Sequence, residues 1–298
     1  MKKSIRHAML AVGIIAGSLS AGAHAAFPAD KPITMVVPFA AGGPTDKVAR
    51  EIALVMGKTL KQTIVIDNSP GAGGTIAAKK VMNAPKDGYT VLIHHIGMST
   101  APGLYKNLGY DPMTDFEHLG MVADVPMVMV ANKDLPAKNL TELLAYIKAN
   151  STKVNYANAG IGSASHLCGL LFMSAIQVDM TTVPYKGTAP ALTDLLGGQV
   201  QLMCDQTTNL SGQLKAGAVK SYGATTMQRI AAFKDIPTMH EQGLKNFEVN
   251  VWHGVYAPKG TPKDATDKLS AALQAGINDA SYKAKMAELG ANIPNAKN

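Results

Sequence analysis

At residues 37–46 the chain reads Val37-Pro38-Phe39-Ala40-Ala41-Gly42-Gly43-Pro44-Thr45-Asp46. The apolar run 33–37 before it is typical of a β-strand, which ends at Pro38 because proline has no backbone N–H to donate. A double-glycine turn follows, and Pro44 stands just ahead of an amphipathic segment that predicts a helix. Such a strand–turn–helix unit points free backbone N–H groups at one spot. This stretch therefore predicts an anion site that needs no lysine or arginine.

The same alternation of short apolar runs and helical patterns continues along the chain, and it predicts an α/β fold with parallel sheets and right-handed crossovers. We expect strands at 33–37, 64–66, 90–93, 122–130, 154–157, 181–184, 200–203, 221–225 and 248–256, with Pro126 interrupting the fourth. We expect helices at 47–60, 75–83, 140–148, 166–174, 189–196, 262–278 and 280–289, the third capped by Asn139 or Thr141.

A second Gly/Ser-rich loop, 158–165, precedes the predicted helix 166–174 in the other half of the chain. Ligands of open α/β sheets bind at the carboxyl ends of strands, beside helix N-termini. Two such loops that face each other across a cleft would form a clamp. In that arrangement the strands 122–130 and 248–256 would cross between two lobes, and the C-terminal helices would return to the first lobe.

Residues 1–25 have the pattern of a secretory signal peptide. Lys2, Lys3 and Arg6 form a basic start, 8–21 is apolar, and Ala23-His24-Ala25 is a small-x-small cleavage site. We expect cleavage near Ala25 and export to a bacterial periplasm, with an uncleaved anchor as the alternative. Removal of three positive charges lowers the net charge from +7 to +4. Without a dense basic run, this charge argues against nucleic-acid binding.

Several catalytic and cofactor motifs are absent from the sequence. Gly42-Gly43 is not followed by the Lys-Ser/Thr of a nucleotide P-loop, and there is no Gly-x-Ser-x-Gly elbow. His94 and His95 alternate across a strand, so both cannot face one metal; either one faces the cleft, or one is packed and the other solvated. We therefore expect no cofactor, no metal and no enzyme activity. The alternative is an exported hydrolase that uses Ser163 or Ser165 with His166.

The few arginines and cysteines indicate how a carboxylate would be recognised and whether a disulfide can form. Outside the leader the chain has only Arg50 and Arg229, so recognition of a carboxylate would rest on backbone N–H groups and hydroxyls rather than on a bidentate arginine. The two cysteines, Cys168 and Cys204, permit one disulfide in an exported protein. Two buried thiols are the alternative.

The order of motifs resembles that of the Bug family, the TctC-like periplasmic solute-binding proteins of tripartite tricarboxylate transporters. The resemblance covers essentially the whole mature chain, and it implies a type II periplasmic-binding-protein fold of two α/β lobes with a central cleft that closes like a Venus flytrap. The motifs that carry it are 37–46, Gly71-Ala72-Gly73-Gly74, Asp87-Gly88-Tyr89-Thr90, Gly162-Ser163 with His166, Val183-Pro184-Tyr185-Lys186-Gly187, 194–200, Pro237-Thr238, Trp252, Ala257-Pro258 and Gly260-Thr261-Pro262.

The resemblance also implies ligand-binding residues. The first loop would hold a carboxylate through backbone amides and waters, with Asp46 as helix cap and water orienter. Cys204 would pair with Cys168 and brace the wall of the cleft, while Phe39 and Met98 would favour a larger or aromatic ring. The expected ligand-binding residues are Phe39, Ala40, Ala41, Gly42, Gly43, Thr45, Asp46, His95, Met98, Ser99, Gly162, Ser163, Ser165, His166, Asp205, Gln206 and Thr207.

These expectations combine into one function. We expect a monomeric periplasmic protein that captures a small organic carboxylate, either a dicarboxylate or an aromatic acid such as terephthalate, and delivers it to the membrane permease subunits of a tripartite tricarboxylate transporter. The alternative with the same ligand is a sensor subunit that presents it to a membrane receptor. We expect lobe I to comprise 26–126 and 250–298, and lobe II to comprise 127–249.

Overall fold

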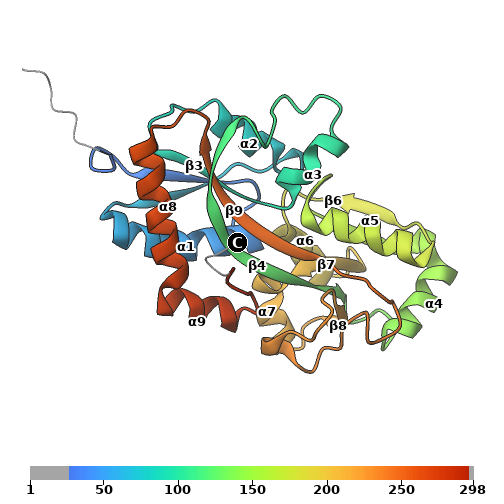
Figure 1. The fold of residues 1–298 in the computed structure, drawn as a ribbon. Coiled ribbons are helices and arrows are strands. Elements are labelled where there is room, and N and C mark those ends of the chain that lie inside the picture. The colour runs from blue at the N-terminus through green and yellow to red at the C-terminus, as the bar shows by residue number, and fades with distance from the viewer. Residues whose placement is uncertain (1–26, 295–298) are drawn as a thin grey trace, which may run out of the picture.

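The chain folds into two α/β lobes that lie side by side and are joined by two long strands (Figure 1). The structure, a computed structural model, describes residues 27–294. The predicted signal peptide, 1–25, lies outside the described residues. Within 27–294, no helix combines the length and the apolar character needed to cross a bilayer.

The first lobe is built on three parallel strands in the order β2-β1-β3. These are β1 (Ile33–Val37), β2 (Ile64–Asn68) and β3 (Thr90–His95). Its helices are α1 (Pro44–Leu60), α2 (Thr75–Met82), α3 (Gly97–Leu104), α8 (Lys263–Asn278) and α9 (Ala280–Glu288). The parallel pairing confirms the strand–helix alternation that the sequence predicts for this half.

Helices α1 and α8 pack together over one face of this sheet. The apolar face of α1, with Val48, Ile52 and Val55, shares one buried core with Leu269 and Leu273 of α8. Burial of such aliphatic side chains is the main favourable term in folding. This packing fixes the N-terminal end of α1 at the carboxyl end of β1.

The second lobe has its own mixed sheet, in the order β4-β7-β5-β6 with β8 on the other side of β4. Its strands are β5 (Asn155–Asn158), β6 (Thr181–Pro184), β7 (Leu202–Gln206) and β8 (Lys220–Ala224). Its helices are α4 (Leu140–Asn150), α5 (Ala164–Ile176), α6 (Thr188–Leu196) and α7 (Thr207–Lys215). The Asn139 side chain accepts a hydrogen bond from the Glu142 amide, so Asn139 rather than Thr141 caps α4.

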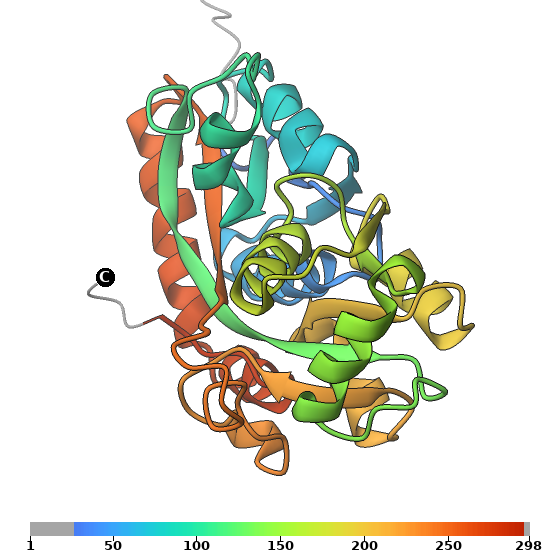
Figure 2. The same ribbon diagram turned by 90° about the vertical axis from the view of Figure 1, so that its right-hand side faces the viewer.

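Two antiparallel strands run from one lobe to the other, as Figure 2 shows. They are β4 (Phe116–Ala131) and β9 (Asn250–Pro258), and β4 belongs to both sheets. The prediction that Pro126 interrupts this strand is wrong. Pro126 pairs with Asn250, the first residue of β9, and the next residue, Met127, already pairs with Gln206 of β7. The missing N–H therefore falls where β4 changes its partner.

Two helices are missing from the sequence prediction, and two begin at least two residues earlier than expected. Helix α3 contains a glycine at its start and Pro102 inside it, both of which disfavour helix, and α7 follows β7 without a turn. Helix α1 begins at Pro44 instead of Lys47, because proline is well suited to the first helical position. Helix α5 begins at Ala164 instead of His166.

We propose to divide the chain at the crossovers, with 26–126 and 250–298 as lobe I and 127–249 as lobe II. One buried core contains Val125 and Val255, and a separate core contains Met127. Val251, which this division assigns to lobe I, packs in the core of lobe II. The two strands thus pass from one core to the other over a few residues.

Candidate functional site

The loop between β1 and α1 is held in shape by the carboxylate of Asp46. This carboxylate accepts hydrogen bonds from the Gly42 amide (2.9 Å), from Asn68 Nδ2 (2.9 Å) and from Arg50 Nε and Nη2 (2.9 and 3.0 Å). The N-cap residue of α1 is Gly43, and its position receives no side-chain cap bond, so the expectation of Asp46 as helix cap is wrong. Instead, Asp46 reaches back from the first turn and fixes the double-glycine turn.

The charge of Asp46 is neutralised locally and does not oppose an anion in front of the helix. Burial alone would raise the pKa of Asp46, but the hydrogen bonds from Arg50, Gly42 and Asn68 outweigh burial and lower the pKa. Asp46 is therefore an ionised carboxylate whose partner is Arg50. The free amides at the start of α1 remain available to a ligand.

The loop between β5 and α5 forms the opposite side. Ser163 caps α5 by accepting a hydrogen bond from the His166 amide (3.2 Å), and its hydroxyl lies 3.1 Å from that of Ser165. Ser165 Oγ also accepts a bond from the Ala159 amide. The His166 ring accepts a bond from the Gly162 amide through Nδ1 and bonds to neither serine within the described chain, so the geometry does not favour the hydrolase alternative.

The two lobes touch each other directly. The Ala40 amide donates to the Lys186 carbonyl (3.0 Å), and Tyr105 donates its hydroxyl to the Ile161 carbonyl (2.6 Å). Lys47 Nζ lies 3.4 Å from the Asn209 carbonyl. Each of these contacts joins an element of the first lobe to one of the second. The cleft between the lobes is consequently almost closed, with about 10 Å³ of internal volume.

Four helix N-termini meet at this cleft: those of α1, α5, α6 and α7. Each N-terminus contributes unpaired amides and the positive end of a helix dipole. The cleft is lined by Phe39, Pro44, Thr45, His95, Ala159, Ser163, Ala164, Ser165, Thr188, Asp205 and Gln206. Such a surface can hold an anion without a cationic side chain.

The structure brings together some, but not all, of the residues expected from sequence. Seven of them line the cleft: Phe39, Thr45, His95, Ser163, Ser165, Asp205 and Gln206. Met98 and Ser99 instead line a separate apolar pocket beside Trp252 and Tyr256. The other expected residues are Ala40, Ala41, Gly42, Gly43, Asp46, Gly162, His166 and Thr207, which lie in the loops and helix starts around the cleft. For all of these residues, a role in ligand binding remains a prediction.

Sequence analysis missed Thr188, the first residue of α6. The sequence contains a pattern that could have indicated this site, because Gly187 precedes a predicted helix in the same way as Gly43. Buried polar atoms mark this part of the cleft. Gln206 Oε1 and Thr207 Oγ1 have no hydrogen-bond partner among the described residues, and the Thr188 hydroxyl has only a poorly formed interaction with the Asp205 carboxylate. Because unpaired buried polar groups are unfavourable, these atoms indicate a place where a polar ligand binds.

Asp205 is the one acidic residue in the cleft lining, and it is fully buried at the end of β7. Its carboxylate accepts bonds from the Gln206 amide (2.8 Å) and from Asn209 Nδ2 (2.6 Å). Burial raises the pKa of Asp205 to about 6, although these bonds, the nearby Thr188 hydroxyl and the positive charge of Lys47 act in the opposite direction.

Three buried histidines lie beside Phe39 at the cleft, and one of them, His95, lines it. His95 stacks on Phe39, with ring centroids 4.9 Å apart, and lies edge-on to His94 and His253. Both His94 and His95 are buried, so the alternative in which one is packed and the other solvated is wrong. Within 27–294 no group of His, Cys, Asp or Glu has an arrangement suited to a metal ion.

Burial keeps these rings neutral, and each ring has a nitrogen that receives a hydrogen bond or pairs with a hydroxyl. His94 Nδ1 accepts from the His95 amide, His95 Nδ1 accepts from the Gly97 amide, and His253 Nε2 pairs with Thr45 Oγ1 at 3.3 Å. A nitrogen that accepts a hydrogen bond carries no proton. Burial lowers the pKa of His94 to about 4 and that of His253 to about 3. The Thr45 hydroxyl is engaged with His253, so its backbone amide is the group left for a ligand.

Cys168 of α5 and Cys204 of β7 form a disulfide, with Cα atoms 6.2 Å apart. This confirms the predicted pair and excludes the alternative of two free thiols. The bond ties the start of α5 to the strand that carries Asp205. Two walls of the cleft are thereby linked covalently.

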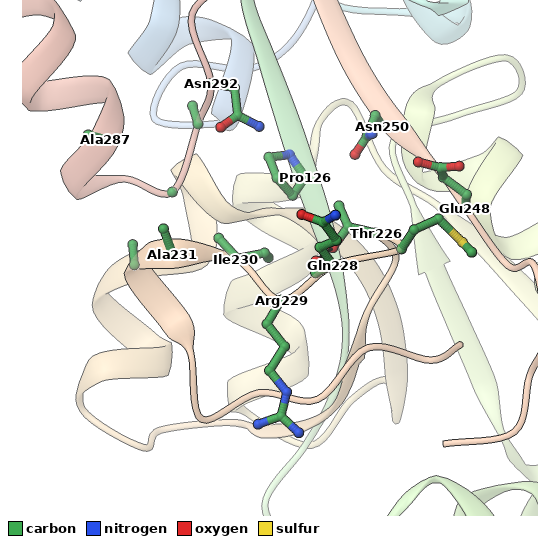
Figure 3. A pocket seen from close by; sticks show the side chains of 14 residues that line it. Pro126, Thr226, Gln228, Arg229, Ile230, Ala231, Glu248, Asn250, Ala287 and Asn292 are labelled. Carbon is green, nitrogen blue, oxygen red and sulfur yellow. Dashed lines mark hydrogen bonds between the residues drawn. The ribbon is translucent and has the colours of Figure 1, made fainter. Parts of the chain in front are cut away.

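A third cavity, of about 480 Å³, lies beside the crossover strands, between the 226–232 loop and the end of α9 (Figure 3). Its lining includes Pro126, Glu248 and Asn250. Arg229 also belongs to the lining, but its guanidinium points away from the other labelled side chains and pairs with Glu241.

A family model and several solved structures are similar to this chain over most of its length. A family model described as "Tripartite tricarboxylate transporter family receptor" matches residues 48–298. The periplasmic binding protein BugD is 54% identical, with a TM-score of 0.87 over 89% of this chain and 88% of its own. MatC from Rhodopseudomonas palustris, solved with bound malate, is 41% identical, with a TM-score of 0.88 over 91% and 92%. Another R. palustris protein, solved with adipate, is 36% identical, with a TM-score of 0.85 over 90% and 89%. These similarities confirm the predicted two-lobed binding-protein fold.

Proposed function

The chain belongs to the family of tripartite tricarboxylate transporter receptors, the Bug-type solute-binding proteins, and from this membership we propose that it captures a small organic carboxylate between its lobes and delivers it to a transporter. The proposed ligand is a dicarboxylate, and terephthalate is the aromatic acid of first choice. Capture requires the lobes to open, because the cleft has only about 10 Å³ of internal volume in the closed arrangement.

One observation carries this proposal: four helix N-termini converge on a buried cleft that holds unpartnered hydroxyls. Amides and hydroxyls at helix starts favour negative charge in front of them. The Ser163 and Ser165 hydroxyls share one hydrogen bond, which leaves one hydroxyl hydrogen free for a ligand. A ligand held by neutral donors can dissociate without separating an ion pair, as a carrier requires.

The proposed ligand class has support from relatives and from the cleft wall. MatC was solved with malate, and another relative was solved with adipate. For terephthalate, the support is the stacked pair of Phe39 and His95 in the cleft wall. Met98, which was expected to assist an aromatic ring, lies in the separate pocket with Trp252.

We further propose that the protein acts as a monomer in the periplasm, after removal of the leader near Ala25, and passes its ligand to the permease subunits. Its relative BugD is described as a periplasmic binding protein. The disulfide is consistent with an oxidising compartment. No catalytic step is part of the proposed function.

The test is a thermal-shift panel of di- and tricarboxylates, amino acids and aromatic acids, terephthalate included, followed by calorimetry on each acid that responds. A ligand that binds only the folded state stabilises it by about 2.7 kcal/mol at a hundredfold excess over Kd. Native mass spectrometry of protein purified without refolding would identify a ligand retained from the cell. If no acid raises Tm, the proposal is wrong.

A matched pair of variants on α6 locates the site. Thr188→Val removes a hydroxyl whose one interaction, with the Asp205 carboxylate, is poorly formed, so we expect little change in stability but binding weaker by about tenfold. Thr193→Val changes an exposed threonine of the same helix, and its affinity should match the wild type. Equal affinities in all three proteins would place the ligand elsewhere.

A further inference from the structure

We propose that the apolar pocket beside Trp252 and Tyr256 is a second binding site, which takes a neutral, mostly hydrocarbon molecule that carries one hydrogen-bond acceptor. We call it the Trp252 pocket. Its lining shares no residue with the lining of the cleft. This inference goes beyond the proposed function and does not depend on it.

The first argument is the size and the composition of the Trp252 pocket. Its volume is about 580 Å³, and small-molecule sites range from roughly 300 to 1,000 Å³. Helix α3, the segment 111–113 and the strands β4 and β9 form its walls. Three methionines, Met98, Met113 and Met121, line it together with the rings of Trp252 and Tyr256. Methionine side chains adapt to irregular shapes and pack favourably on rings, so this lining favours an occupant with a hydrocarbon body.

The second argument is the way in which β9 forms the floor of the pocket. Side chains alternate along a strand, so Trp252, Gly254 and Tyr256 share one face of β9. Gly254 has no side chain to fill this face, and a Cβ added there would lie 2.9 Å from the Tyr256 hydroxyl oxygen. That hydroxyl therefore lies over Gly254, on the floor of the pocket. His253 belongs to the opposite face and pairs with Thr45 of the cleft, so the two faces of β9 serve two different sites.

The third argument is the hydrogen bond that the Tyr256 hydroxyl lacks. Tyr256 is only 4% exposed, and its hydroxyl forms no hydrogen bond with another described residue. Buried tyrosine hydroxyls usually have a partner. Burial raises the pKa of Tyr256, so the hydroxyl keeps its proton and is available as a donor. A carbonyl or ether oxygen on the occupant would accept this hydrogen bond.

The charge of the lining favours a neutral occupant. Among the described residues, no lysine or arginine lines the Trp252 pocket, and its one carboxylate, Asp111, is exposed. A ligand carboxylate would be removed from water without a cation to pair with, which is unfavourable. An ammonium group could pair only with Asp111, and it would leave the Tyr256 hydroxyl without an acceptor. This preference is the opposite of the one proposed for the cleft.

The experiment uses methyl cyclohexanecarboxylate as the neutral probe and cyclohexanecarboxylate as its anionic counterpart. Trp252 is the only tryptophan in the chain, and it lines the pocket, so its fluorescence reports occupancy at the site itself. We expect the ester to shift the Trp252 emission to shorter wavelength in a saturable way at pH 7.5, because it displaces water from the indole. Isothermal titration calorimetry gives its Kd. Displacement of the ester by the carboxylate should require at least a tenfold higher concentration.

Two variants locate the ester within the pocket. Tyr256→Phe removes only the hydroxyl without a partner, so we expect an unchanged Tm and binding of the ester weaker by about fivefold. Tyr146→Phe, at a half-buried tyrosine of lobe II, is the matched control and should bind the ester like the wild type. Ser99→Phe places a ring on the α3 side of the pocket, and it should weaken binding by at least about tenfold. Ser174→Phe, at an exposed serine of α5, is its control.

Three results would each overturn the inference. The first is an ester that causes no saturable shift of the Trp252 emission. The second is a carboxylate that displaces the ester at equal concentration, because the site would then not prefer a neutral molecule. The third is an ester Kd in both Tyr256→Phe and Ser99→Phe equal to that of the wild type, because the ester would then bind elsewhere. None of these results bears on the binding of acids in the cleft, which the thermal-shift panel tests separately.

Discussion

Of the two glycines in the first loop, only Gly42 has a backbone conformation that favours glycine. Its φ is +79°, in the left-handed region, whereas Gly43 is extended, with φ −76°. A Cβ added to Gly43 would lie 3.3 Å from the Ala40 carbonyl oxygen, which is tight but not prohibitive. The sequence shows two equivalent glycines, and only the backbone distinguishes the one that makes the turn from the one that begins the helix.

The three buried histidines predict a loss of stability in mild acid. In the unfolded chain a histidine has a pKa near 6.5, whereas burial lowers the pKa of His94 to about 4. Between these values the unfolded state binds a proton and the native state does not, so the free energy of unfolding falls as pH falls from about 6.5 to 4. For His94 alone the loss is about 3 kcal/mol, and His95 and His253 add to it.

Asp205 acts in the opposite direction over part of this range. Its pKa is raised to about 6, so the native state takes up its proton first and gains stability as pH falls from about 6 to 4. The gain from Asp205 offsets the loss from only one of the three histidines, so the free energy of unfolding should still decrease as pH falls. Urea unfolding at pH 7, 6, 5 and 4.5 would measure it. His94→Gln should flatten the slope, the exposed His118→Gln should not, and a free energy that does not change with pH would contradict the assignment.

At the scale of elements, the sequence predicts the strand–helix units well and their connections poorly. Apolar strands and amphipathic helices such as 33–37 and 47–60 are local patterns. Helix α3 is not, because its glycine and Pro102 disfavour helix and only packing on the first lobe overrides them. The continuous β4 depends on a change of pairing partner at Pro126, and the place of Thr188 depends on how α6 meets α1 across the cleft. Such tertiary relations leave no local pattern in the sequence.

The disulfide between α5 and β7 should contribute to stability through the unfolded state. It closes a segment with a sequence separation of 36 residues, for which the chain-entropy model gives about 3–4 kcal/mol. We expect Cys168→Ala with Cys204→Ala to lower the free energy of unfolding by about this amount in urea titrations. The matched control is the wild-type protein treated with a reductant, which should unfold like the double variant. If a reductant strong enough to open the bond does not change the free energy of unfolding of the wild-type protein, the disulfide does not make this contribution.

For the whole molecule, the closed arrangement depends on backbone approaching backbone across the cleft. Gly73, in the short η1 segment (Ala72–Gly74) of lobe I, lies against the Ile161 carbonyl of lobe II. A Cβ on Gly73 would lie 1.8 Å from that oxygen, closer than any real contact allows. The neighbouring Tyr105 hydroxyl donates to the same oxygen. Glycine at this position therefore permits closure, and its role is invisible within either lobe alone.

Gly73→Ala should hold the lobes apart without unfolding them, because rigid-body opening relieves the contact. We expect a larger radius of gyration in small-angle X-ray scattering with ligand present, and binding weaker by at least about tenfold, since affinity falls with the population of the closed state. Gly217→Ala is the matched control: its φ of +58° is close to the +61° of Gly73, but its Cβ would meet nothing within 4 Å. Both variants carry the strain of a left-handed alanine, about 1 kcal/mol. Only Gly73→Ala should change closure, and if the two variants bind and scatter alike, the contact between Gly73 and Ile161 does not limit closure.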